Sequence, residues 1–534
     1  MPPIADLLAD HLSPADGRSV RDLMRALKAD PRTARIPRTQ VERALAGDAR
    51  FTRSGDGPKA VWELAGDAPT PPPAHRRTTG GLPRAVDAGD PLAGLDLRDW
   101  QVEAFAAWAA AGMRGVVEAV TGTGKTRLAV AAVRVALAHD GRVLVVVPTL
   151  DLVDQWTTEL RRLVPGARLG RLGGGDADDL HDHHVVVATP HSAAAVPFDV
   201  PAGHPGLLVA DEAHRYGAPT WGAALRPDFG MRLALTATYE RNDDGIEDVL
   251  GPYFGAVVCA YGYERAVPDG VVAPFRIAFA GTALEEHERA TYDELDRRVR
   301  QLHRDLVGTY GFSRDPRRLF AAVAATVAAA EGDPSRRRDP RVAACREYLF
   351  RVRTRRDVAA TAAGKLDVVA ALAPGIARHA DRTLVFTDTV DQAEQAARLL
   401  CRAGVPAETV SSELPEKQRR IRLAQFRNGN LRVVVAPRVL DEGVDVPAAD
   451  VAIVLAAFRT RRQMIQRLGR VLRLKDDGRP ARLVVAFAKD TREDPADGAH
   501  EGFLREVVPV AAEVTTFDAD TSRTELADWL AVER

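Results

Sequence analysis

The chain has 534 residues, which is too long for a single hydrophobic core and predicts three or four domains. Hydrophobic residues make up 46% of it and charged residues 28%, as in an ordinary globular protein, and its apolar runs are strand-length, far short of a membrane span. The formal net charge of −1 neither supports nor excludes a nucleic-acid partner, because a local basic groove is enough for phosphate contact.

The N-terminus and the cysteines indicate where the protein works. Asp6 and Asp10 interrupt the only apolar stretch at the N-terminus, so the pattern is not that of a signal peptide. The three cysteines, Cys259, Cys345 and Cys401, are isolated and odd in number, which disfavours both a disulfide framework and a zinc site. We therefore expect a reducing, cytoplasmic setting and no membrane partner.

Residues 1–66 are expected to form a small winged helix-turn-helix domain. Three segments with helical spacing are followed by two strand segments around a turn at Ser54: Ile4–His11, Val20–Leu27, Thr39–Leu45, Phe51–Arg53 and Ala60–Leu64. Arginines around the third helix and near the hairpin suit contact with phosphates. The alternative is a helical protein-interaction module with a solvated basic face.

The rest of the chain predicts an α/β fold class. Residues 67–94 are rich in proline and glycine and are interpreted as a linker. Strand-like runs alternate with Ala-rich helical stretches over 95–280 and again over 366–490, which indicates two tandem parallel-sheet domains. Residues 281–365, mostly helical and charged, are expected to be an insertion or bridge between them. Residues 491–534 are a C-terminal extension to which the pattern assigns little.

A glycine-rich loop between a strand and a helix predicts a phosphate site. The strand covers 115–118, the loop runs Ala119-Val-Thr-Gly-Thr-Gly-Lys-Thr126, and the helix covers 127–138. Backbone N–H groups of such a loop turn inward around phosphate oxygens, and the helix N-terminus adds positive potential. The predicted nucleotide-binding residues of this loop are Thr121, Gly122, Thr123, Gly124, Lys125 and Thr126.

Two side chains of this loop carry the chemistry. Lys125 is expected to reach the outer phosphates, and the Thr126 hydroxyl to coordinate Mg²⁺. The sequence departs from the general pattern at Ala119, where many phosphate loops have their first glycine. The alternative, a Gly-rich turn with an incidental lysine, is disfavoured by the order of strand, loop and helix.

A second acidic motif follows a buried strand. Gly206–Ala210 is an apolar run that ends in Asp211-Glu-Ala-His214. A carboxylate at the carboxyl end of a parallel strand faces the ligand crevice of such sheets. Asp211 is therefore expected to hold Mg²⁺ through water, and Glu212 to orient and deprotonate the attacking water. The alternative is a solvated strand end.

The motifs, in this order, resemble those of superfamily 2 helicases of the DEAH-box type. The resemblance covers about residues 95–490 and is greatest to the subgroup of XPB-like repair helicases and motor subunits of type III restriction enzymes. It implies two RecA-like domains that close on one ATP·Mg²⁺ and move along a nucleic acid.

The resemblance also implies roles for further residues of the first domain. Gln101, in the segment 97–101, would hydrogen-bond the adenine, with Trp100 packed beside the base. Thr149 and Thr189 would touch phosphates of the nucleic acid. The residues implied to couple the nucleotide site to the nucleic-acid path are His214, Thr236 and Thr238.

In the second domain, residues 382–388 resemble the fourth motif of the family, and Thr387 would contact nucleic acid. Residues 439–447 resemble the fifth motif, with Gly443 and Asp445 facing the nucleotide. Many relatives carry Ser or Thr early in this motif, where this chain has Pro437. Proline offers neither a hydroxyl nor an N–H, so we expect Arg438 to compensate through its charge.

Residues 466–473 resemble the sixth motif. Gln466, Arg470 and Arg473 share one face of a helix through their spacings of four and three. Arg470 and Arg473 are expected to point across the cleft as arginine fingers, which neutralise charge developing during phosphoryl transfer. The alternative is a basic helix face in water.

Several functional hypotheses remain open at this point. The first is an ATP-dependent motor that acts on nucleic acid, with DNA favoured over RNA. The others are a DNA-binding regulatory protein switched by ATP, and the motor subunit of a larger complex with a nuclease, defence or repair protein as partner. The insertion 281–365 is either a packing bridge or a lever that rests on DNA.

Overall fold

The computed structural model describes residues 18–19, 51–54, 61–64, 86, 89–196, 199–241, 243–331, 338–437, 449–455, 469, 478–497, 505–519, 521 and 523–531. The chain divides into two compact units, residues 1–81 and residues 82–534.

The described part of the first unit is a small antiparallel sheet. Its strands are β1 (Arg18–Ser19), β2 (Phe51–Ser54) and β3 (Val61–Leu64), in the order β1-β3-β2. Phe51 pairs with Leu64 and Ser54 with Val61, which confirms the predicted hairpin. The three predicted helices lie outside the described residues, so the winged helix stays a prediction.

The first α/β domain is built on an eight-stranded sheet in the order β11-β4-β10-β9-β5-β8-β6-β7, with all described pairs parallel except β6–β7. Its strands are β4 (Arg114–Ala119), β5 (Arg142–Val146), β6 (Leu169–Gly173), β7 (Asp176–Ala177), β8 (Val185–Ala188), β9 (Gly206–Asp211), β10 (Met231–Thr236) and β11 (Val257–Tyr261). Its helices are α4 (Asp99–Ala110), α5 (Lys125–Ala138), α6 (Leu150–Leu163), α7 (Pro190–Ala195), α8 (Pro219–Gly222), α9 (Gly251–Phe254) and α10 (Tyr263–Ala266), with helical turns at Ala213–Gly217 and Ile246–Leu250.

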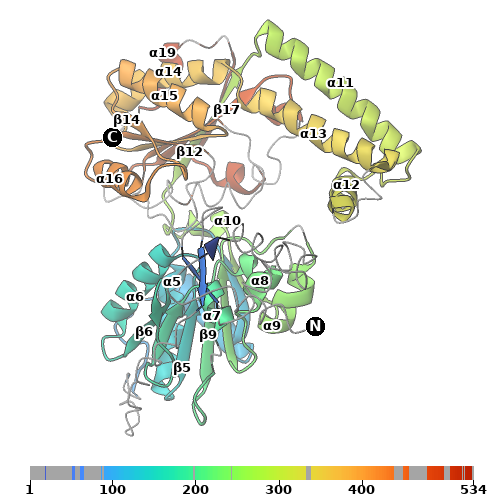
Figure 1. The fold of residues 1–534 in the computed structure, drawn as a ribbon. Coiled ribbons are helices and arrows are strands. Elements are labelled where there is room, and N and C mark those ends of the chain that lie inside the picture. The colour runs from blue at the N-terminus through green and yellow to red at the C-terminus, as the bar shows by residue number, and fades with distance from the viewer. Residues whose placement is uncertain are drawn as a thin grey trace. The chain divides into compact units, whose positions relative to one another are not determined.

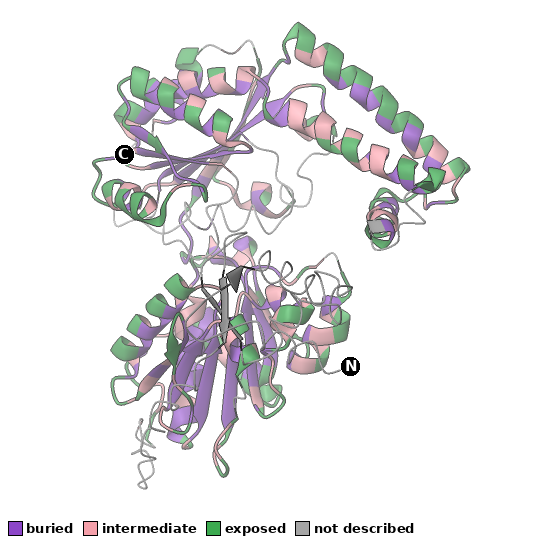
Figure 2. Ribbon diagram, in the orientation of Figure 1, coloured by how far each residue is buried: buried purple, intermediate pink, exposed green. Residues whose placement is uncertain are grey.

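Helices cover both faces of the sheet (Figure 1). The central strands are therefore buried on both sides, which explains why they are continuous apolar runs. Successive residues of a strand belong to different hydrophobic cores, as the two-residue side-chain period requires. Val143 and Val145 of β5 pack in one core, and Leu144 and Val146 in the other. Figure 2 shows the strands buried and the outer helix faces exposed.

The second α/β domain is a seven-stranded parallel sheet in the order β14-β15-β13-β16-β17-β12-β18. Its strands are β12 (Phe275–Thr282), β13 (Thr383–Thr387), β14 (Ala407–Thr409), β15 (Val433–Pro437), β16 (Val451–Val454), β17 (Ala481–Ala488) and β18 (Glu513–Phe517). Its helices include α14 (Gly364–His379), α15 (Val390–Arg402), α16 (Glu416–Arg427) and α19 (Arg523–Asp528), with short helical turns at Pro495–Asp497 and Val508–Val510.

The predicted domain boundaries differ from the observed ones at two places. β12 was expected within or beside the first domain, which was predicted to end at residue 280, but it pairs along its whole length with β17 of the second sheet. The C-terminal extension 491–534 contributes the edge strand β18 to the same sheet. An alternating pattern reveals a strand but not which distant strand it pairs with, and this explains both differences.

The predicted helical insertion is confirmed as helical, and it is inserted within the second domain. It follows β12 and consists of α11 (Glu286–Gly308), α12 (Pro316–Glu331) and α13 (Pro340–Ala360), after which α14 begins. The three helices share a small hydrophobic core of their own, to which Leu306, Leu319 and Cys345 belong. α11 and α13 run side by side (Figure 1). Both ends of the insertion therefore join the second sheet, rather than linking one domain to the other.

One described helical stretch, 340–379, is long and apolar enough to cross a membrane by length and composition. It contains α13 and α14, and 61% of its most apolar window is buried inside the protein. Packing against the second sheet and the insertion accounts for that apolar character.

A buried ion pair closes the amino-terminal edge of the second sheet. Asp450 precedes β16 and Arg482 lies at the start of β17, and Arg482 Nη2 donates to Asp450 Oδ2 at 2.5 Å. The Asp450 carboxylate also accepts from the backbone N–H groups of Asp381 and Arg382. Both side chains are almost fully buried.

We expect Asp450→Ala to destabilise the second domain by about 3–5 kcal/mol, because it leaves the buried Arg482 guanidinium without its counter-charge. Asp381→Ala breaks only the exposed ion pair between Asp381 and Arg479 and should cost under about 1 kcal/mol. Urea unfolding followed by circular dichroism measures both. Equal losses in the two variants would contradict the assignment.

Candidate active site

The predicted site residues of the first domain follow three strands that lie side by side. In the sheet, β10 lies between β4 and β9 and is parallel to both. The glycine-rich loop follows β4, the acidic motif ends β9, and Thr236 ends β10. Because the carboxyl ends of parallel strands share one edge, the fold brings these three segments together, as predicted.

The backbone of the loop has the conformation that a phosphate cradle needs. Gly122 and Gly124 have φ values of +85° and +94°, in the region that residues with a Cβ rarely adopt. Gly124 is the N-cap of α5, and a Cβ on it would lie 2.8 Å from Gln101 Nε2. The buried Thr123 hydroxyl donates to the carbonyl of Val120 at 2.8 Å and closes the loop. The N–H groups at the start of α5 thus remain at the helix terminus, where anions bind.

Lys125 lies at the floor of this loop. Its Nζ donates to the carbonyls of Ala119 at 2.7 Å and Val120 at 3.3 Å. Burial lowers the pKa of Lys125, while the nearby charges of Glu212 and Asp211 act in the opposite direction. A phosphate oxygen is charged and is a stronger hydrogen-bond acceptor than a carbonyl. The Lys125 ammonium can therefore exchange its hydrogen bonds with the two carbonyls for hydrogen bonds with a phosphate.

Asp211 and Glu212 occupy the end of β9. Burial raises the pKa of Asp211. Two contacts oppose that rise: a hydrogen bond of 3.0 Å from Trp156 Nε1 to Asp211 Oδ2, and the positive charge of Lys125. Glu212 has a left-handed backbone with φ of +52°, and its N–H donates to Asp211 Oδ1 at 3.0 Å. This strained turn directs two successive carboxylates into one site.

The three predicted coupling residues form one buried network. His214 Nδ1 lies 3.0 Å from Thr236 Oγ1, and the Thr236 hydroxyl donates to the carbonyl of Thr238 at 2.7 Å. His214 Nδ1 is also 3.5 Å from Glu212 Oε2. The acidic turn is therefore connected directly to the segment after β10.

Arg241 makes a further link that the sequence patterns did not suggest. Its guanidinium donates to the backbone carbonyl of His214 and forms a two-pronged ion pair with Asp243, with both contacts at 2.6 Å. A Cβ on Gly217 or Gly245 would strike this guanidinium. In the sequence, only the presence of glycine at these two positions pointed to this contact, and a glycine alone does not show which side chain approaches it.

The predicted adenine contacts are engaged within the protein. Gln101 is 1% exposed, its Nε2 donates to the carbonyl of Gly124 at 2.9 Å, and its Oε1 accepts from Arg98 N at 2.8 Å. Arg98 Nη1 donates to Thr123 O at 2.9 Å. Gln101 and Arg98 thus brace the phosphate loop, and a contact of Gln101 with a base stays a prediction.

Trp100, expected to pack beside the base, is likewise engaged within the protein, and its contact with a base stays a prediction. Its indole ring is 2% exposed and stacks on Tyr261, with ring centroids 4.6 Å apart and planes at 13°. The pair fixes the start of α4 against β11. An aromatic residue beside a motif is often part of the core, because large rings bury the most surface.

The predicted nucleic-acid contacts of the first domain stand at helix starts. Thr149 is the N-cap of α6, where its Oγ1 accepts from Leu152 N at 3.4 Å, and Thr189 precedes α7, where its hydroxyl contacts Ser192 Oγ at 3.0 Å. Both are half-buried, so part of each remains accessible at the loop. Helix N-termini of this kind suit phosphate oxygens.

Thr387, the predicted contact of the second domain, is fully buried, and its hydroxyl donates to the carbonyl of Thr389 at 2.9 Å. Its contact with nucleic acid stays a prediction. Thr389 caps α15 through a hydrogen bond from Gln392 N, as Thr149 caps α6. Thr389, two residues beyond the strand, thus holds the N-cap position in the second domain that Thr149 holds in the first.

Most residues of the fifth and sixth motifs lie outside the described residues: Arg438, Gly443, Asp445, Gln466, Arg470 and Arg473. Gly469 is described and buried, and it lies against the phosphate loop. A Cβ built on Gly469 would fall 1.3 Å from Thr121 Oγ1. The neighbour of the predicted finger Arg470 thus approaches a predicted nucleotide-binding residue.

Comparisons with known proteins agree with this geometry. Residues 94–241 match the family described as "Type III restriction enzyme, res subunit", and residues 364–475 match "Helicase conserved C-terminal domain". The DNA 3'-5' translocase XPB2 of Sulfurisphaera tokodaii is 30% identical over 412 residues, which are 75% of this chain and 83% of that protein.

Two further comparisons gave weaker matches. The putative DNA 3'-5' helicase Rad25 of Haloarcula marismortui is 27% identical over 429 residues, and the matched part is 77% of this chain but only 56% of that protein. The solved helicase domain of Hef from Pyrococcus furiosus has 20% identity and a TM-score of 0.49, and the match covers 76% of this chain and 98% of that one.

We expect Trp156→Phe to shift the acidic limb of the ATPase pH profile to higher pH. The indole N–H stabilises the charged carboxylate of Asp211, so its loss raises the pKa of Asp211 further, and the carboxylate protonates at a higher pH than in the wild type. Trp108→Phe is the matched control, because its indole donates to the carbonyl of Arg232, away from the site. Superimposable profiles for Trp156→Phe and the wild type would refute the role of Trp156.

Proposed function

Because the chain belongs to the superfamily 2 helicases of the XPB-like and type III restriction motor kind, we propose that it is an ATP-driven motor that translocates along DNA or separates its strands. Proteins of this family use ATP hydrolysis to work on nucleic acid. The observation that carries the proposal is the buried network of Glu212, His214, Thr236 and Thr238, because it joins a hydrolysis motif to a neighbouring strand end.

The first domain supplies the groups that ATP needs. The loop backbone around Gly122 and Gly124 suits the phosphates, and Lys125 would transfer its hydrogen bonds from two loop carbonyls to the outer phosphate oxygens. Thr126 and Asp211 fit a bound Mg²⁺, since a hydroxyl and a carboxylate are oxygen ligands. When bound, Mg²⁺ would supply charge neutralisation at the β- and γ-phosphates.

Glu212 is the residue proposed to direct hydrolysis. Its strained turn holds the carboxylate beside Asp211, and the site is sufficiently buried to raise the pKa of the latter. A carboxylate in such surroundings can orient a water and accept its proton in the transition state. Closure of the second domain would bring Gln466, Arg470 and Arg473 to the same phosphates, and the approach of Gly469 to Thr121 supports that arrangement.

DNA is the proposed track. The relatives from Sulfurisphaera and Haloarcula are named as a DNA translocase and a putative DNA helicase, whereas phosphate contacts such as those proposed for Thr149 and Thr189 carry no sugar preference. Arg438 would add a charge contact in the second domain, and residues 1–66 would bind duplex DNA as a winged helix. The protein would act in the cytoplasm, in repair, restriction or phage defence. Its partner would be a nuclease, a defence protein or a repair protein.

We expect Glu212→Gln to slow DNA-stimulated ATP hydrolysis at least about 100-fold, while ATP still binds. The amide keeps the shape of the side chain but cannot accept a proton from water. Turnover with single-stranded DNA, duplex DNA and RNA, together with nucleotide binding by fluorescence, measures this. Lys125→Ala is the companion variant and should weaken nucleotide binding itself.

Two outcomes would contradict the proposal, the first by rejecting the motor and the second by rejecting its track. Wild-type turnover that no polymer stimulates would favour an ATP-switched DNA-binding protein instead. Stimulation by RNA but not by DNA would reject the proposed track and favour an RNA helicase.

Deletion of residues 1–66 should weaken duplex DNA binding and reduce its salt dependence, because each lost phosphate contact lowers the slope of log Kd against log salt by roughly one. ATPase activity without DNA should stay unchanged. Binding measured at several salt concentrations checks this. An unchanged affinity and slope would reject a winged-helix role and favour a protein-interaction module.

A further inference from the structure

Two opposite charges are buried together at the carboxyl edge of the second sheet. Lys365, in the first turn of α14, has no exposed surface, and its Nζ lies 2.5 Å from Glu493 Oε2 in the loop 489–494 after β17. The Glu493 side chain is 5% exposed. Burying two charges costs several kcal/mol each before their attraction compensates, so such a pair is a poor source of stability alone. A positional role is the better explanation for it.

Lys365 also holds the end of a third strand. Its Nζ donates to the backbone carbonyl of Leu455 at 2.7 Å. Leu455 directly follows β16, and the segment 456–477 that begins after it carries Gln466, Arg470 and Arg473. The ammonium therefore fixes the point at which the proposed arginine-finger segment leaves the sheet.

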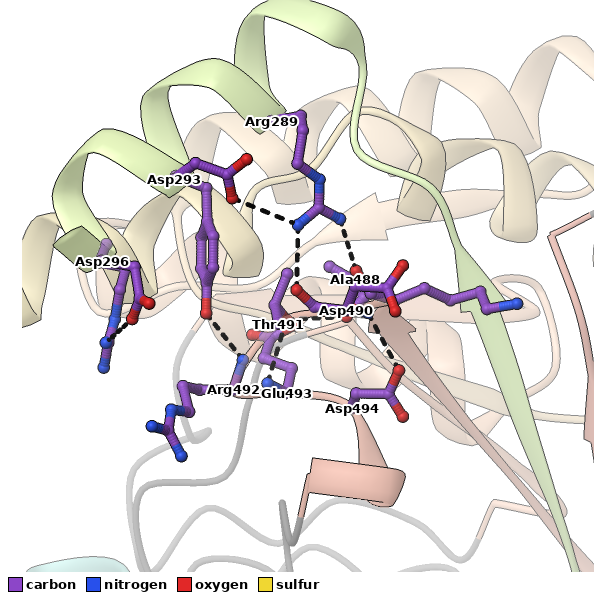
Figure 3. Close-up of polar contacts among 12 residues, drawn as sticks. Arg289, Asp293, Asp296, Ala488, Asp490, Thr491, Arg492, Glu493 and Asp494 are labelled. Carbon is purple, nitrogen blue, oxygen red and sulfur yellow. Dashed lines mark hydrogen bonds and ion pairs between the residues drawn. The ribbon is translucent and has the colours of Figure 1, made fainter.

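The same loop is fastened to the helical insertion (Figure 3). Arg289 of α11 donates to the carbonyls of Lys489 at 2.7 Å and Asp490 at 3.0 Å. The backbone N–H of Arg492 donates to Tyr292 Oη at 2.8 Å. Since Glu493 is the next residue, the base of α11, the loop 489–494, Lys365 and Leu455 form one continuous set of contacts.

The sheet order explains why these groups meet. β17 lies between β16 and β12, and all three strands are parallel. The carboxyl end of β17 leads into loop 489–494, that of β16 into the finger segment, and that of β12 into the insertion. The other buried ion pair of this sheet, Asp450–Arg482, lies at the opposite, amino-terminal edge, away from the ligand crevice of such sheets.

We propose that Lys365 and Glu493 are positioning residues for ATP hydrolysis, because their ion pair fixes the root of the arginine-finger segment and fastens that root to the base of the helical insertion. The inference rests on the proposed function. Arginine fingers act on charge that develops in the transition state, so a small displacement of their root affects the transition state more than bound ADP. A load on the insertion would reach the nucleotide site along the same contacts.

The first experiment compares affinities for ADP and for ADP·aluminium fluoride, a transition-state analogue, in the presence of Mg²⁺ and duplex DNA. In Lys365→Met/Glu493→Gln both buried charges are removed together, so no unpaired charge remains. We expect the affinity for ADP to stay within about two-fold and that for the analogue to fall about 10- to 100-fold, since a misplacement of about 1 Å costs on the order of 100-fold.

The matched control is Asp450→Asn/Arg482→Met, which removes an equally buried ion pair from the other edge of the same sheet. It should leave the ratio of the two affinities unchanged. A purely structural role lowers the number of binding sites in both double variants without changing the ratio. If the double variants do not fold, Glu493→Gln against Asp450→Asn gives the same comparison. An unchanged ratio in the Glu493 variants, or an equal change in the Asp450 variants, overturns the proposal.

The second experiment tests the link to the insertion. Arg289→Ala removes the two hydrogen bonds of the Arg289 side chain with loop 489–494 and leaves the contact of Tyr292, whereas Arg298→Ala removes an ion pair of the same helix with Glu347 of α13. We expect DNA stimulation of kcat to fall about three-fold or more in Arg289→Ala only, with unstimulated turnover and DNA affinity unchanged. Equal stimulation in both variants would overturn this link. A wild type without any stimulation by DNA would reject the proposed function itself, a different result.

Discussion

The chemistry of this protein depends on the convergence of parallel strands at their carboxyl ends. In the first sheet, β4, β10 and β9 are neighbours, and the phosphate loop, the Thr236–Thr238 segment and the acidic turn emerge beside one another. No side chain has to reach far, because the register of the sheet has already placed all three segments. The helices on both faces keep that register, since alternate residues of strands such as β5 belong to two separate cores.

Burial then adjusts the charges that the sheet brings together. The pKa of Lys125 is lowered and that of Asp211 is raised, each chiefly by burial, while each residue also stabilises the charged form of the other. Trp156 holds Asp211 and the carbonyls of Ala119 and Val120 hold Lys125, so both groups are oriented before a nucleotide arrives. Such preorganisation is what gives a buried polar site its effect on a developing charge.

The sequence allowed much of this to be predicted, and the exceptions have physical causes. The phosphate loop and the acidic turn were predictable because their chemistry lies in contiguous residues, whereas the coupling roles of His214, Thr236 and Thr238 were implied by the resemblance to superfamily 2 helicases and stay predictions. The packing of Trp100 against Tyr261 and the pairing of β12 with β17 across the predicted boundary at residue 280 were not predictable, since each depends on contacts with a distant segment. The same holds for Arg241 and His214, whose link joins residues from different strand ends.

In the second sheet, too, the pairing of parallel strands decides which loops lie close together. Its strand β12 precedes the insertion, and β17 lies many residues later, yet they pair over their full length. Helix α11 must therefore leave the sheet beside the loop that follows β17, and that loop lies beside the end of β16. The insertion is therefore rooted one strand away from the end of β16, because β17 lies between β12 and β16. The buried pair of Lys365 and Glu493 spans that interval, since it joins the loop after β17 to the carbonyl of Leu455 directly after β16.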